Sequence, residues 1–517
     1  MSLKEAQLER LEQMNQAAEI SGGEARIAKQ HASGKMTARE RMLYFFDDGT
    51  FEEIDKFVIH RCTDFGMEKK KIVGDGVVSG YGRVNGRLTY ACAQDFTAIG
   101  GTLSETNAKK MCKILDMAAK NGAPFVGLND SGGARIHEGV SSLGGYAELF
   151  YRNTIYSGVI PQIATILGPC AGGAVYSPAI MDFIVMTEKS SYMFITGPNV
   201  IKTVTNEDVT QEKLGGSDTH MKISGVSHLA GKDDKDSIDQ VKRLLSFMPQ
   251  SNREKAPLTH FKGEAEMLIP ELNDVVPADS RRPYDIKKII KMVADNADFL
   301  ETQPKYAANL VTGFARFNGE SVGIIANQPN FMAGCLDINA SDKCARFIRF
   351  CDCFNIPLLT FVDVPGFLPG SGQEFGGIIR HGAKIIFAYA EATVPKITIT
   401  TRKSFGGAYC AMSSRQLGAD IHYAYPTAEF SVMGPEGAVN IVFNKELKGA
   451  DDPVAKRQEL VDDYKDNFAN PYRAAAYGFV DEVIKPEETR IKIIRALEML
   501  QDKEEQLPYR KHSNIPL

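Results

Sequence analysis

The stretch Gly80-Tyr-Gly-Arg-Val-Asn-Gly86 recurs in the second half of the chain as Gly313-Phe-Ala-Arg-Phe-Asn-Gly319. Each copy places an Asn-Gly pair between two β-rich stretches. Asn-Gly is the strongest short hairpin signal, because both residues tolerate the positive φ of a type I′ turn. We therefore expect each half of the chain to open with a β-hairpin.

Further matches extend this repeat along the chain. Pro124 with Pro357, Asp130 with Asp363 and Gly133 with Gly366 are matched at the same spacing as the two hairpin motifs. Two later matches have slightly longer spacings: Gly172-Gly-Ala174 with Gly406-Gly-Ala408, and Gly197-Pro198 with Gly434-Pro435. Nearly equal spacings in chain order indicate an internal duplication with small insertions.

Each half contains a helical stretch followed by apolar strands that start at proline. The helices are expected over 106–120 and 340–354, and the strands after Pro124, Pro161, Pro357 and Pro395. Continuous apolar strands that alternate with helices indicate sheets covered by helices, so the fold class is α/β. Five prolines between 249 and 283 predict a linker. We place the domain boundary near 260, giving domains 1–260 and 261–517.

Composition excludes several classes of protein. The 517 residues are 43% hydrophobic and 24% charged, as in ordinary globular proteins. With 65 acidic and 60 basic residues, the chain lacks the basic field of a nucleic-acid-binding protein. Nine cysteines without a CxxC pair indicate reduced thiols and no zinc ribbon. The same cysteine spacing predicts no structural metal. Residues 1–19 form a charged helical pattern without an apolar signal core, and together with the reduced thiols this predicts a cytoplasmic protein.

The two Gly-Gly-Ala segments are the strongest chemical signal. Each follows a buried strand and precedes a helix, at equivalent positions of the repeat. Glycine leaves backbone N–H groups uncovered, and at a helix N-terminus these groups suit a developing oxyanion. Close packing between strand and helix is the alternative explanation. Recurrence of the segment in both halves favours the chemical role.

Long ordered motifs give the chain a family resemblance. In the first half these are Gly34-Lys-Met-Thr-Ala-Arg-Glu-Arg41, Asn129-Asp-Ser-Gly-Gly-Ala-Arg-Ile136, Gly168-Pro-Cys-Ala-Gly-Gly-Ala-Val-Tyr-Ser-Pro178 and Phe194-Ile-Thr-Gly-Pro198. In the second half they are Ala333-Gly-Cys-Leu-Asp-Ile338, Phe361-Val-Asp-Val-Pro-Gly-Phe-Leu-Pro369, Gly376-Gly-Ile-Ile-Arg-His-Gly-Ala383 and 511–517. Over essentially its whole length the chain resembles the carboxyltransferase subunits of biotin-dependent acyl-CoA carboxylases and decarboxylases, especially propionyl-CoA carboxylase β chains and methylmalonyl-CoA decarboxylase α subunits.

The resemblance implies two tandem crotonase-like domains, with acyl-CoA on domain 1–260 and biotin on domain 261–517. It also implies a hexamer in which the first half of one subunit faces the second half of its neighbour. Biotin would arrive on a separate carrier protein, and the chain itself would bind neither metal nor nucleotide. The direction of the reaction stays open. The remaining partner would be a biotin carboxylase subunit if the chain carboxylates propionyl-CoA, or a membrane decarboxylase subunit if it decarboxylates methylmalonyl-CoA.

The resemblance also implies roles for individual residues. Gly172 and Gly173 would hold the enolate oxygen of the thioester, and Gly407 and Ala408 the ureido oxygen of biotin. Additional contacts to the substrate are expected from Gly133, Ala134, Arg135 and Ala174, and additional contacts to biotin from Gly366, Phe367 and Gly406. The released ureido anion can take the α-proton itself, so no side-chain base is required.

Three other residues leave alternatives open. Arg135 suits a phosphate or carboxylate of the substrate, and equally a buried structural ion pair. His381 invites a general-base role, although a histidine beside glycine at a turn is more often structural. Cys410 is expected to line the acyl pocket without covalent chemistry, because no histidine lies within ten residues of it. Many propionyl-CoA carboxylases have an acidic residue there, which leaves the preferred acyl group open.

Other functional classes fit less well. A free-standing crotonase-like hydratase or hydrolase needs carboxylates near a Gly-Gly turn, and neither Gly172 nor Gly407 has an acidic residue within five positions. A noncatalytic scaffold for the biotin carrier would not need two intact turns. Gly-x-Ser-x-Gly, Walker A and Gly-x-Gly-x-x-Gly motifs are absent, which argues against serine hydrolases, ATPases and dinucleotide enzymes.

Overall fold

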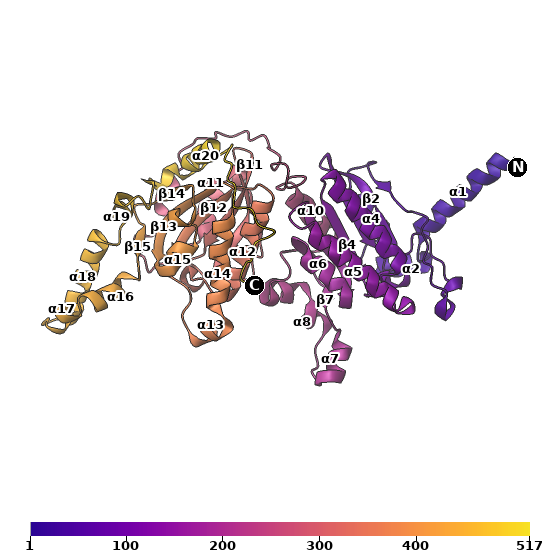
Figure 1. Ribbon diagram of the computed structural model, residues 1–517, viewed down its shortest axis with the longest axis horizontal. Coiled ribbons are helices and arrows are strands. Elements are labelled where there is room, and N and C mark those ends of the chain that lie inside the picture. Colours follow the sequence, from indigo (N-terminus) through magenta and orange to yellow (C-terminus); the bar gives the residue numbers. More distant parts are fainter. Residues whose placement is uncertain (1) are drawn as a thin grey trace. The chain divides into compact units, whose positions relative to one another are not determined.

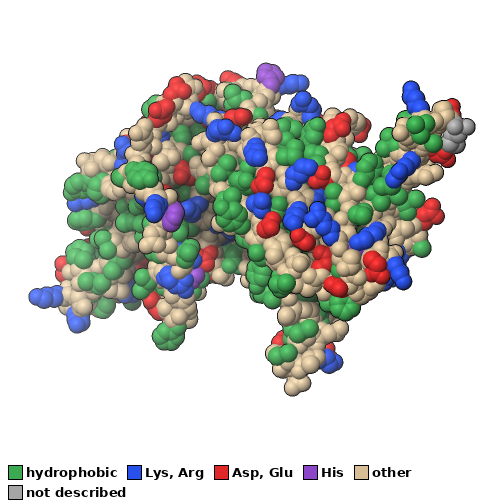
Figure 2. Space-filling view, turned by 45° about the vertical axis from the view of Figure 1, so that its right-hand side comes forward, with side chains coloured by type: hydrophobic (Ala, Val, Ile, Leu, Met, Phe, Trp, Pro, Cys, Tyr) green, Lys and Arg blue, Asp and Glu red, His purple; other side chains and the backbone are tan. Residues whose placement is uncertain are grey.

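The computed structural model describes residues 2–517, and the chain forms two compact units, Met1–Lys255 and Ala256–Leu517 (Figure 1). We call them the N unit and the C unit. The assignment of acyl-CoA to one unit and biotin to the other stays a prediction. Among the described residues, no helix is long and apolar enough to cross a membrane. The visible face of the N unit carries acidic and basic side chains interspersed with one another (Figure 2).

A mixed sheet forms the centre of the N unit. Its strand order is β1-β2-β3-β4-β5-β6-β8, and β7 pairs with the far end of β5. β1, β2 and β3 are antiparallel, and the strands from β3 onward are parallel. The bounds are β1 (Glu52–Glu53), β2 (Val77–Val84), β3 (Arg87–Gln94), β4 (Phe125–Ser131), β5 (Gln162–Ala171), β6 (Phe183–Thr187), β7 (Tyr192–Phe194) and β8 (Leu229–Gly231).

The C unit repeats this sheet strand for strand. Its order is β9-β10-β11-β12-β13-β14-β16, with β15 paired to the far end of β13. The bounds are β9 (Phe299–Thr302), β10 (Leu310–Phe317), β11 (Glu320–Asn327), β12 (Leu358–Val364), β13 (Lys396–Phe405), β14 (Ile421–Ala424), β15 (Glu429–Ser431) and β16 (Glu482–Val483). The predicted α/β class with two similar tandem domains is confirmed.

Helices cover both faces of each sheet (Figure 1). In the N unit, α4 and α5 bury their apolar residues against β3, β4 and β5, while α3 and α10 pack against the strands from the other face. The N-unit bounds are α1 (Leu3–Ile20), α2 (Glu24–Ala32), α3 (Ala38–Phe45), α4 (Glu105–Asn121), α5 (Val140–Ile155), α6 (Tyr176–Ile180), α7 (Pro198–Thr205), α8 (Gln211–Gly215), α9 (Ser217–Thr219) and α10 (Asp234–Leu245).

In the C unit, α12 and α14 cover one face, and α11 and α20 pack on the other in one hydrophobic core. Beyond β15, α16 and α18 pack on each other around Val439 and Leu460. The C-unit bounds are α11 (Ile286–Val293), α12 (Ile338–Cys353), α13 (Ser371–Gly376), α14 (Ile378–Glu391), α15 (Gly406–Ala411), α16 (Pro435–Val442), α17 (Asn444–Lys448), α18 (Pro453–Asn467), α19 (Pro471–Ala476) and α20 (Thr489–Met499).

Both predicted hairpins are present. Asn85 and Gly86 have φ of 52° and 76°, and Asn318 and Gly319 have φ of 49° and 84°. An aspartate accepts from both amides of each turn. Asp47 lies 3.1 and 2.8 Å from the two amide nitrogens of the first turn. Asp295 lies 3.1 and 2.7 Å from those of the second turn, and its Oδ1 also accepts from the buried Arg490 at 2.7 Å.

Equivalent buried lysines hold the segment that leads into each hairpin. Lys110 on α4 donates to the carbonyl oxygens of Gly74 and Val77. Lys343 on α12 donates to four carbonyls between Gln303 and Leu310. Burial lowers the pKa of Lys110 to about 8 and that of Lys343 to about 7. Because each amine donates to carbonyls of the segment that leads into its hairpin, it ties that segment to the helix covering the sheet.

The two hairpin aspartates make a matched pair for mutagenesis. Asp47→Ala removes two turn hydrogen bonds, which we expect to cost about 1–2 kcal/mol. Asp295→Ala removes the same two bonds and also leaves the guanidinium of Arg490 buried without its carboxylate, a loss of about 3–5 kcal/mol. Differential scanning fluorimetry of the full-length variants should therefore show the larger fall in Tm for Asp295→Ala. Equal falls would mean that the Arg490 ion pair contributes nothing to stability.

Candidate active site

The two Gly-Gly-Ala segments form the same strand-to-helix turn in both units. In the N unit β5 ends at Ala171 and a 3-10 turn begins at Gly172. In the C unit β13 ends at Phe405 and α15 begins at Gly406. Gly172 and Gly406 have φ of 61° and 59°, a left-handed conformation that favours glycine. The first amides after each turn have no acceptor within their own helix.

The open side of the turn differs between the units. A Cβ at Gly173 would lie 3.0 Å from the ring of Tyr146, so this position is packed from behind. A Cβ at Gly407 would meet no atom of the chain within 4 Å. Gly407 therefore has space beside it that a ligand atom can enter, and its own φ does not require glycine.

A second loop lies beside each turn because β4 pairs with β5, and β12 pairs with β13, at equivalent positions of the two units. Ser131 is opposite Cys170 in the N unit, and Val364 is opposite Ser404 in the C unit. The N-unit loop comes so close that a Cβ at Gly133 would lie 2.8 Å from the carbonyl oxygen of Ala171. The predicted residues Gly133 to Arg135 and Gly172 to Ala174 are thus brought together within one unit. Gly366, Phe367 and the turn 406–408 occupy the corresponding places in the other.

Backbone pairing orients one peptide group in each of these loops. The N–H of Leu103 donates to the Gly133 carbonyl at 2.9 Å, and the N–H of Arg135 donates to the Leu103 carbonyl at 2.8 Å. Because alternate peptide groups of an extended chain point to opposite sides, the N–H of Ala134 points away from Leu103. Leu336 forms the same bridge around Phe367 in the C unit. Ala134 and Phe367 are therefore equivalent.

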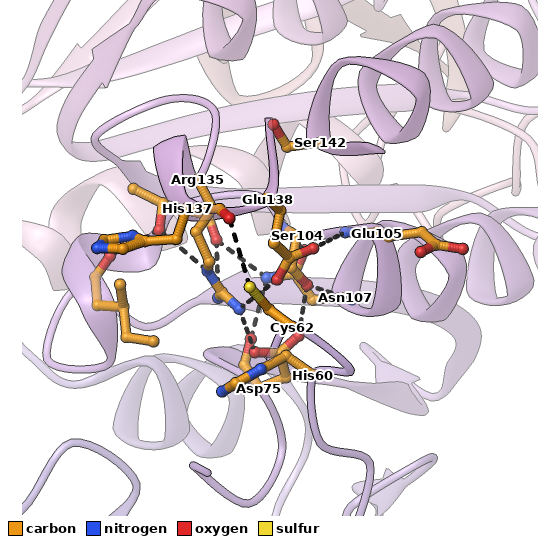
Figure 3. Close-up of polar contacts among 12 residues, drawn as sticks. His60, Cys62, Asp75, Ser104, Glu105, Asn107, Arg135, His137, Glu138 and Ser142 are labelled. Carbon is orange, nitrogen blue, oxygen red and sulfur yellow. Dashed lines mark hydrogen bonds and ion pairs between the residues drawn. The ribbon is translucent and has the colours of Figure 1, made fainter. Parts of the chain in front are cut away.

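Arg135 lies in a buried polar network, and its side chain points toward Asp75 (Figure 3). Its Nη1 donates to Asp75 at 2.6 Å and to Glu138 at 3.3 Å, and its Nη2 donates to the Thr102 carbonyl at 3.1 Å. Asp75 also accepts from the Ser104 hydroxyl. The structure therefore contains the ion pair that was one of the two alternatives for Arg135. A direct substrate contact stays a prediction.

A buried aspartate lies beneath each turn, where the register of the central strands shifts. In the N unit Asp130 is 3.0 Å from Arg41 and 2.6 Å from Lys35. In the C unit Asp363 is 3.0 Å from Arg402. Burial raises the pKa of Asp363, and the Arg402 charge opposes that shift. Arg41 and Lys35 belong to a motif behind the resemblance, but nothing local in the sequence indicated which acid they would meet.

An apolar cavity of about 530 Å³ opens beside the C-unit turn. Gly406, Gly407 and Cys410 are among its lining residues, and Cys410 is exposed; a place for Cys410 in an acyl pocket stays a prediction. The remaining lining is largely aromatic and comes from α15, β15, the C-cap of α18, and α19 with the residues that follow it: Tyr409, Phe430, Phe468, Tyr477 and Phe479, with Arg473. Sequence reasoning missed this wall, since most of it lies far beyond the turn in the chain.

A second cavity, of about 580 Å³, opens in the N unit beside Pro169 and Tyr192, near the end of β5. It is basic. Its cationic lining consists of Arg26, Lys29, Lys35 and Lys189. Lys35 stacks over Phe96 at 5.1 Å, and within residues 2–517 neither Lys29 nor Lys189 has an ion-pair partner. An anionic group fits such a cavity.

His381, which the sequence singled out, has a structural partner. Nδ1 of His381 lies 2.9 Å from Asp342, which also pairs with Lys384 at 2.7 Å. This arrangement supports the structural role of His381. No cluster of three or more His, Cys, Asp or Glu side chains suited to a metal ion occurs in the described part of the chain.

Comparison with known proteins identifies the family. Residues 29–515 match the carboxyl transferase domain model. The chain is 58% identical over 517 residues to the methylmalonyl-CoA decarboxylase α subunit of Propionigenium modestum, covering 100% of both. It is 56% identical over 513 residues to the carboxyltransferase subunit of propionyl-CoA carboxylase from Haloferax mediterranei, covering 99% of both.

Among solved structures, the chain resembles transcarboxylase 12S with a TM-score of 0.97 and 53% identity, over 100% of this chain and 99% of that one. That structure is a hexamer with methylmalonyl-CoA and methylmalonic acid bound. The resemblance drawn from the sequence motifs is thereby confirmed. The chain belongs to the carboxyl transferase family and is a biotin-dependent acyl-CoA carboxyltransferase of the type found in propionyl-CoA carboxylases and methylmalonyl-CoA decarboxylases.

Proposed function

We propose that this chain moves a carboxyl group between carboxybiotin on a separate carrier protein and the α-carbon of propionyl-CoA, whose carboxylated form is (S)-methylmalonyl-CoA. The observation that carries the proposal is the pair of Gly-Gly-Ala turns at equivalent ends of two equivalent strands, β5 and β13. The reaction passes through two oxyanions. Each turn offers backbone amides to one of them.

The bonds exchanged define what the protein must stabilise. In carboxybiotin, the bond between the ureido nitrogen and the carboxyl carbon breaks. Its electron pair stays on the ureido group, and CO₂ is released. The ureido anion takes the α-proton of the acyl-CoA, and the resulting enolate forms the new C–C bond to CO₂. The protein therefore has to stabilise a ureido oxygen and an enolate oxygen, and it needs no side-chain base for the proton.

In the N unit, we assign the enolate oxygen to the amides of Gly172 and Gly173, with Ala134 beside them. Support comes from the close approach of the two loops at Gly133 and Ala171. The basic cavity beside Pro169 suits the phosphates of CoA, since Lys29 and Lys189 line it without a counter-ion in the described chain. These two features together support the assignment of acyl-CoA to the N unit.

In the C unit, we assign the ureido oxygen to the amides of Gly407 and Ala408, with Gly406, Gly366 and Phe367 around it. The open space at Gly407 and the aromatic cavity beside it support this assignment, because a flat heterocycle packs well against aromatic rings. This chain holds the ring and its charge, and the carrier protein brings the carboxyl group.

Because we assign the two half-sites to different units, we propose that a second copy completes the site, in a hexamer like that of transcarboxylase 12S. The carrier protein is one further partner. A biotin carboxylase or a membrane decarboxylase subunit is the other, and it sets whether the chain works toward carboxylation or decarboxylation. The direct test of the proposal is transfer of labelled carboxyl from methylmalonyl-CoA to free biotin by the purified chain. Absence of transfer would contradict it.

Gly407→Val tests the C-unit turn. A Cβ at this position meets no atom of the chain within 4 Å, and the valine side chain would fill the space that the ureido oxygen would enter. We expect carboxyl transfer to biotin to fall by about 10²–10³-fold. Calorimetric binding of propionyl-CoA should stay nearly unchanged, because that site is assigned to the N unit.

The matched control is Gly449→Val. This glycine follows α17, has no positive φ, and a Cβ there would meet only backbone at 3.6 Å or more. It should keep wild-type transfer. Loss of CoA-ester binding in Gly407→Val, equal to the loss of transfer, would reverse the assignment of the two turns.

Cys410 is expected to tune acyl length without covalent chemistry. Its side chain lines the cavity beside Gly407, where it can meet the acyl group of substrate held on a facing N unit. Changing one methylene in such a wall shifts preference by roughly 10–200-fold. Cys410→Ala and Cys410→Ile should therefore change the ratios of kcat/KM among acetyl-, propionyl- and butyryl-CoA. Inactivation of Cys410→Ala on all three esters would instead indicate a catalytic thiol.

The oligomer should be required for activity. If acyl and biotin half-sites on different copies form each active site, dilution should not yield an active single chain. Analytical ultracentrifugation across a range of concentrations, with transfer assayed on the same samples, measures this. A monomer with full activity would contradict the shared site.

A further inference from the structure

The aromatic cavity of the C unit contains one charged side chain, Arg473, and no acidic one among its lining residues. Arg473 lies in the first turn of α19, and its backbone N–H donates to the cap residue Asn470 at 2.9 Å. That bond fixes the backbone of Arg473, whose side chain lines the cavity together with Phe479 and Tyr477. An arginine keeps its charge at any working pH, so this wall carries a permanent cation.

Two aromatic rings orient the guanidinium. Its carbon lies 4.8 Å from the ring centre of Phe468 and 5.6 Å from that of Tyr477, and its Nη2 is 3.4 Å from the Tyr477 hydroxyl. Stacking of this kind limits rotation of the planar group while leaving most of its N–H donors unused. The guanidinium is therefore held in place without being neutralised.

Neighbouring cations outside the cavity are engaged by polar partners. Lys465 on α18 lies 3.3 Å from Glu429, and Arg457 donates to Asn440 at 2.9 Å. No described Asp or Glu forms an ion pair with Arg473, although 65 acidic residues are present in the chain. Arg473 is exposed at an apolar wall and has no counter-ion, so its N–H donors are open to an anionic ligand.

We propose that Arg473 recognises the carboxylate that the enzyme transfers. The proposal rests on the function proposed above, because only then does the cavity beside Gly407 receive the reacting groups. The planar guanidinium matches the two oxygens of a carboxylate. That carboxylate is present in two ligands, as the α-carboxylate of methylmalonyl-CoA and as the N-carboxylate of carboxybiotin. Propionyl-CoA and unmodified biotin lack it.

The test compares ligands that differ by this carboxylate, using the full-length oligomer. Calorimetry measures binding of methylmalonyl-CoA and propionyl-CoA to the wild type, Arg473→Met, Arg473→Lys and the control Arg457→Met. If Arg473 holds the ester carboxylate, Arg473→Met weakens methylmalonyl-CoA about 10-fold or more. Propionyl-CoA should change less than about 2-fold, and Arg473→Lys should be intermediate, because lysine keeps the charge and loses the planar fork.

If Arg473 instead holds the N-carboxylate of carboxybiotin, each ester should bind the variants as tightly as it binds the wild type. In that case the KM for carboxybiotin in transfer to propionyl-CoA rises by a similar factor, while the KM for free biotin in the reverse reaction does not. Either pattern supports the proposal. It is overturned if no ligand is affected, or if ligands with and without the carboxylate weaken alike in variants whose Tm is unchanged.

The same measurements separate this proposal from the proposed function. A wild-type oligomer that binds neither ester and transfers no carboxyl to biotin contradicts the proposed function. A wild type that transfers carboxyl normally, with Arg473→Met and Arg457→Met indistinguishable from it, contradicts only the role of Arg473.

Discussion

The buried aspartate at the register shift of each sheet is the constraint on which both turns depend. Asp130 and Asp363 lie where the central strand pair loses its regular pairing, at the point where the chain approaches the Gly-Gly-Ala turn. A carboxylate with about 1% or less of its surface exposed is costly unless cations and hydrogen bonds satisfy it. In both units the cations that pair with the aspartate fix the end of its strand, β4 or β12, against the end of the strand that carries the turn, β5 or β13.

The two units supply this cation differently, and the difference follows from one position. Gly168 in β5 corresponds to Arg402 in β13 at the spacing of the turns. Arg402 reaches Asp363 from its own strand, whereas a Cβ at Gly168 would collide with the carboxylate of Asp130 at 2.0 Å. The N unit therefore uses Arg41 and Lys35 from the chain before its sheet. The same segment contributes Arg26, Lys29 and Lys35 to the basic cavity, so fold stability and proposed CoA recognition share one element.

Local signals in the sequence predicted much of this organisation. The type I′ turns depend on Asn-Gly alone, and the duplication depends on spacing, so both were visible without the structure. The Arg41 ion pairs join residues 89 and 193 positions apart, and no local pattern indicates such partners. The same reason left Arg135 with two alternatives until Asp75, 60 residues away, was placed beside it. The wall containing Arg473 was missed because it enters the site from a later helix.

Duplication explains how one scaffold can serve two chemically similar charges and still distinguish the molecules that bear them. Backbone amides hold each oxygen in the proposed mechanism, and amides are the same whatever the side chain, so both copies could keep the turn. Recognition then depends on what surrounds it. Tyr146 closes the space behind Gly173, whereas Gly407 is open beside an aromatic cavity. Cations line the N-unit cavity, whereas one arginine lies in the C-unit wall. Sequence divergence in the walls, with the turns retained, is therefore the change that would convert a symmetric repeat into a site for two different substrates.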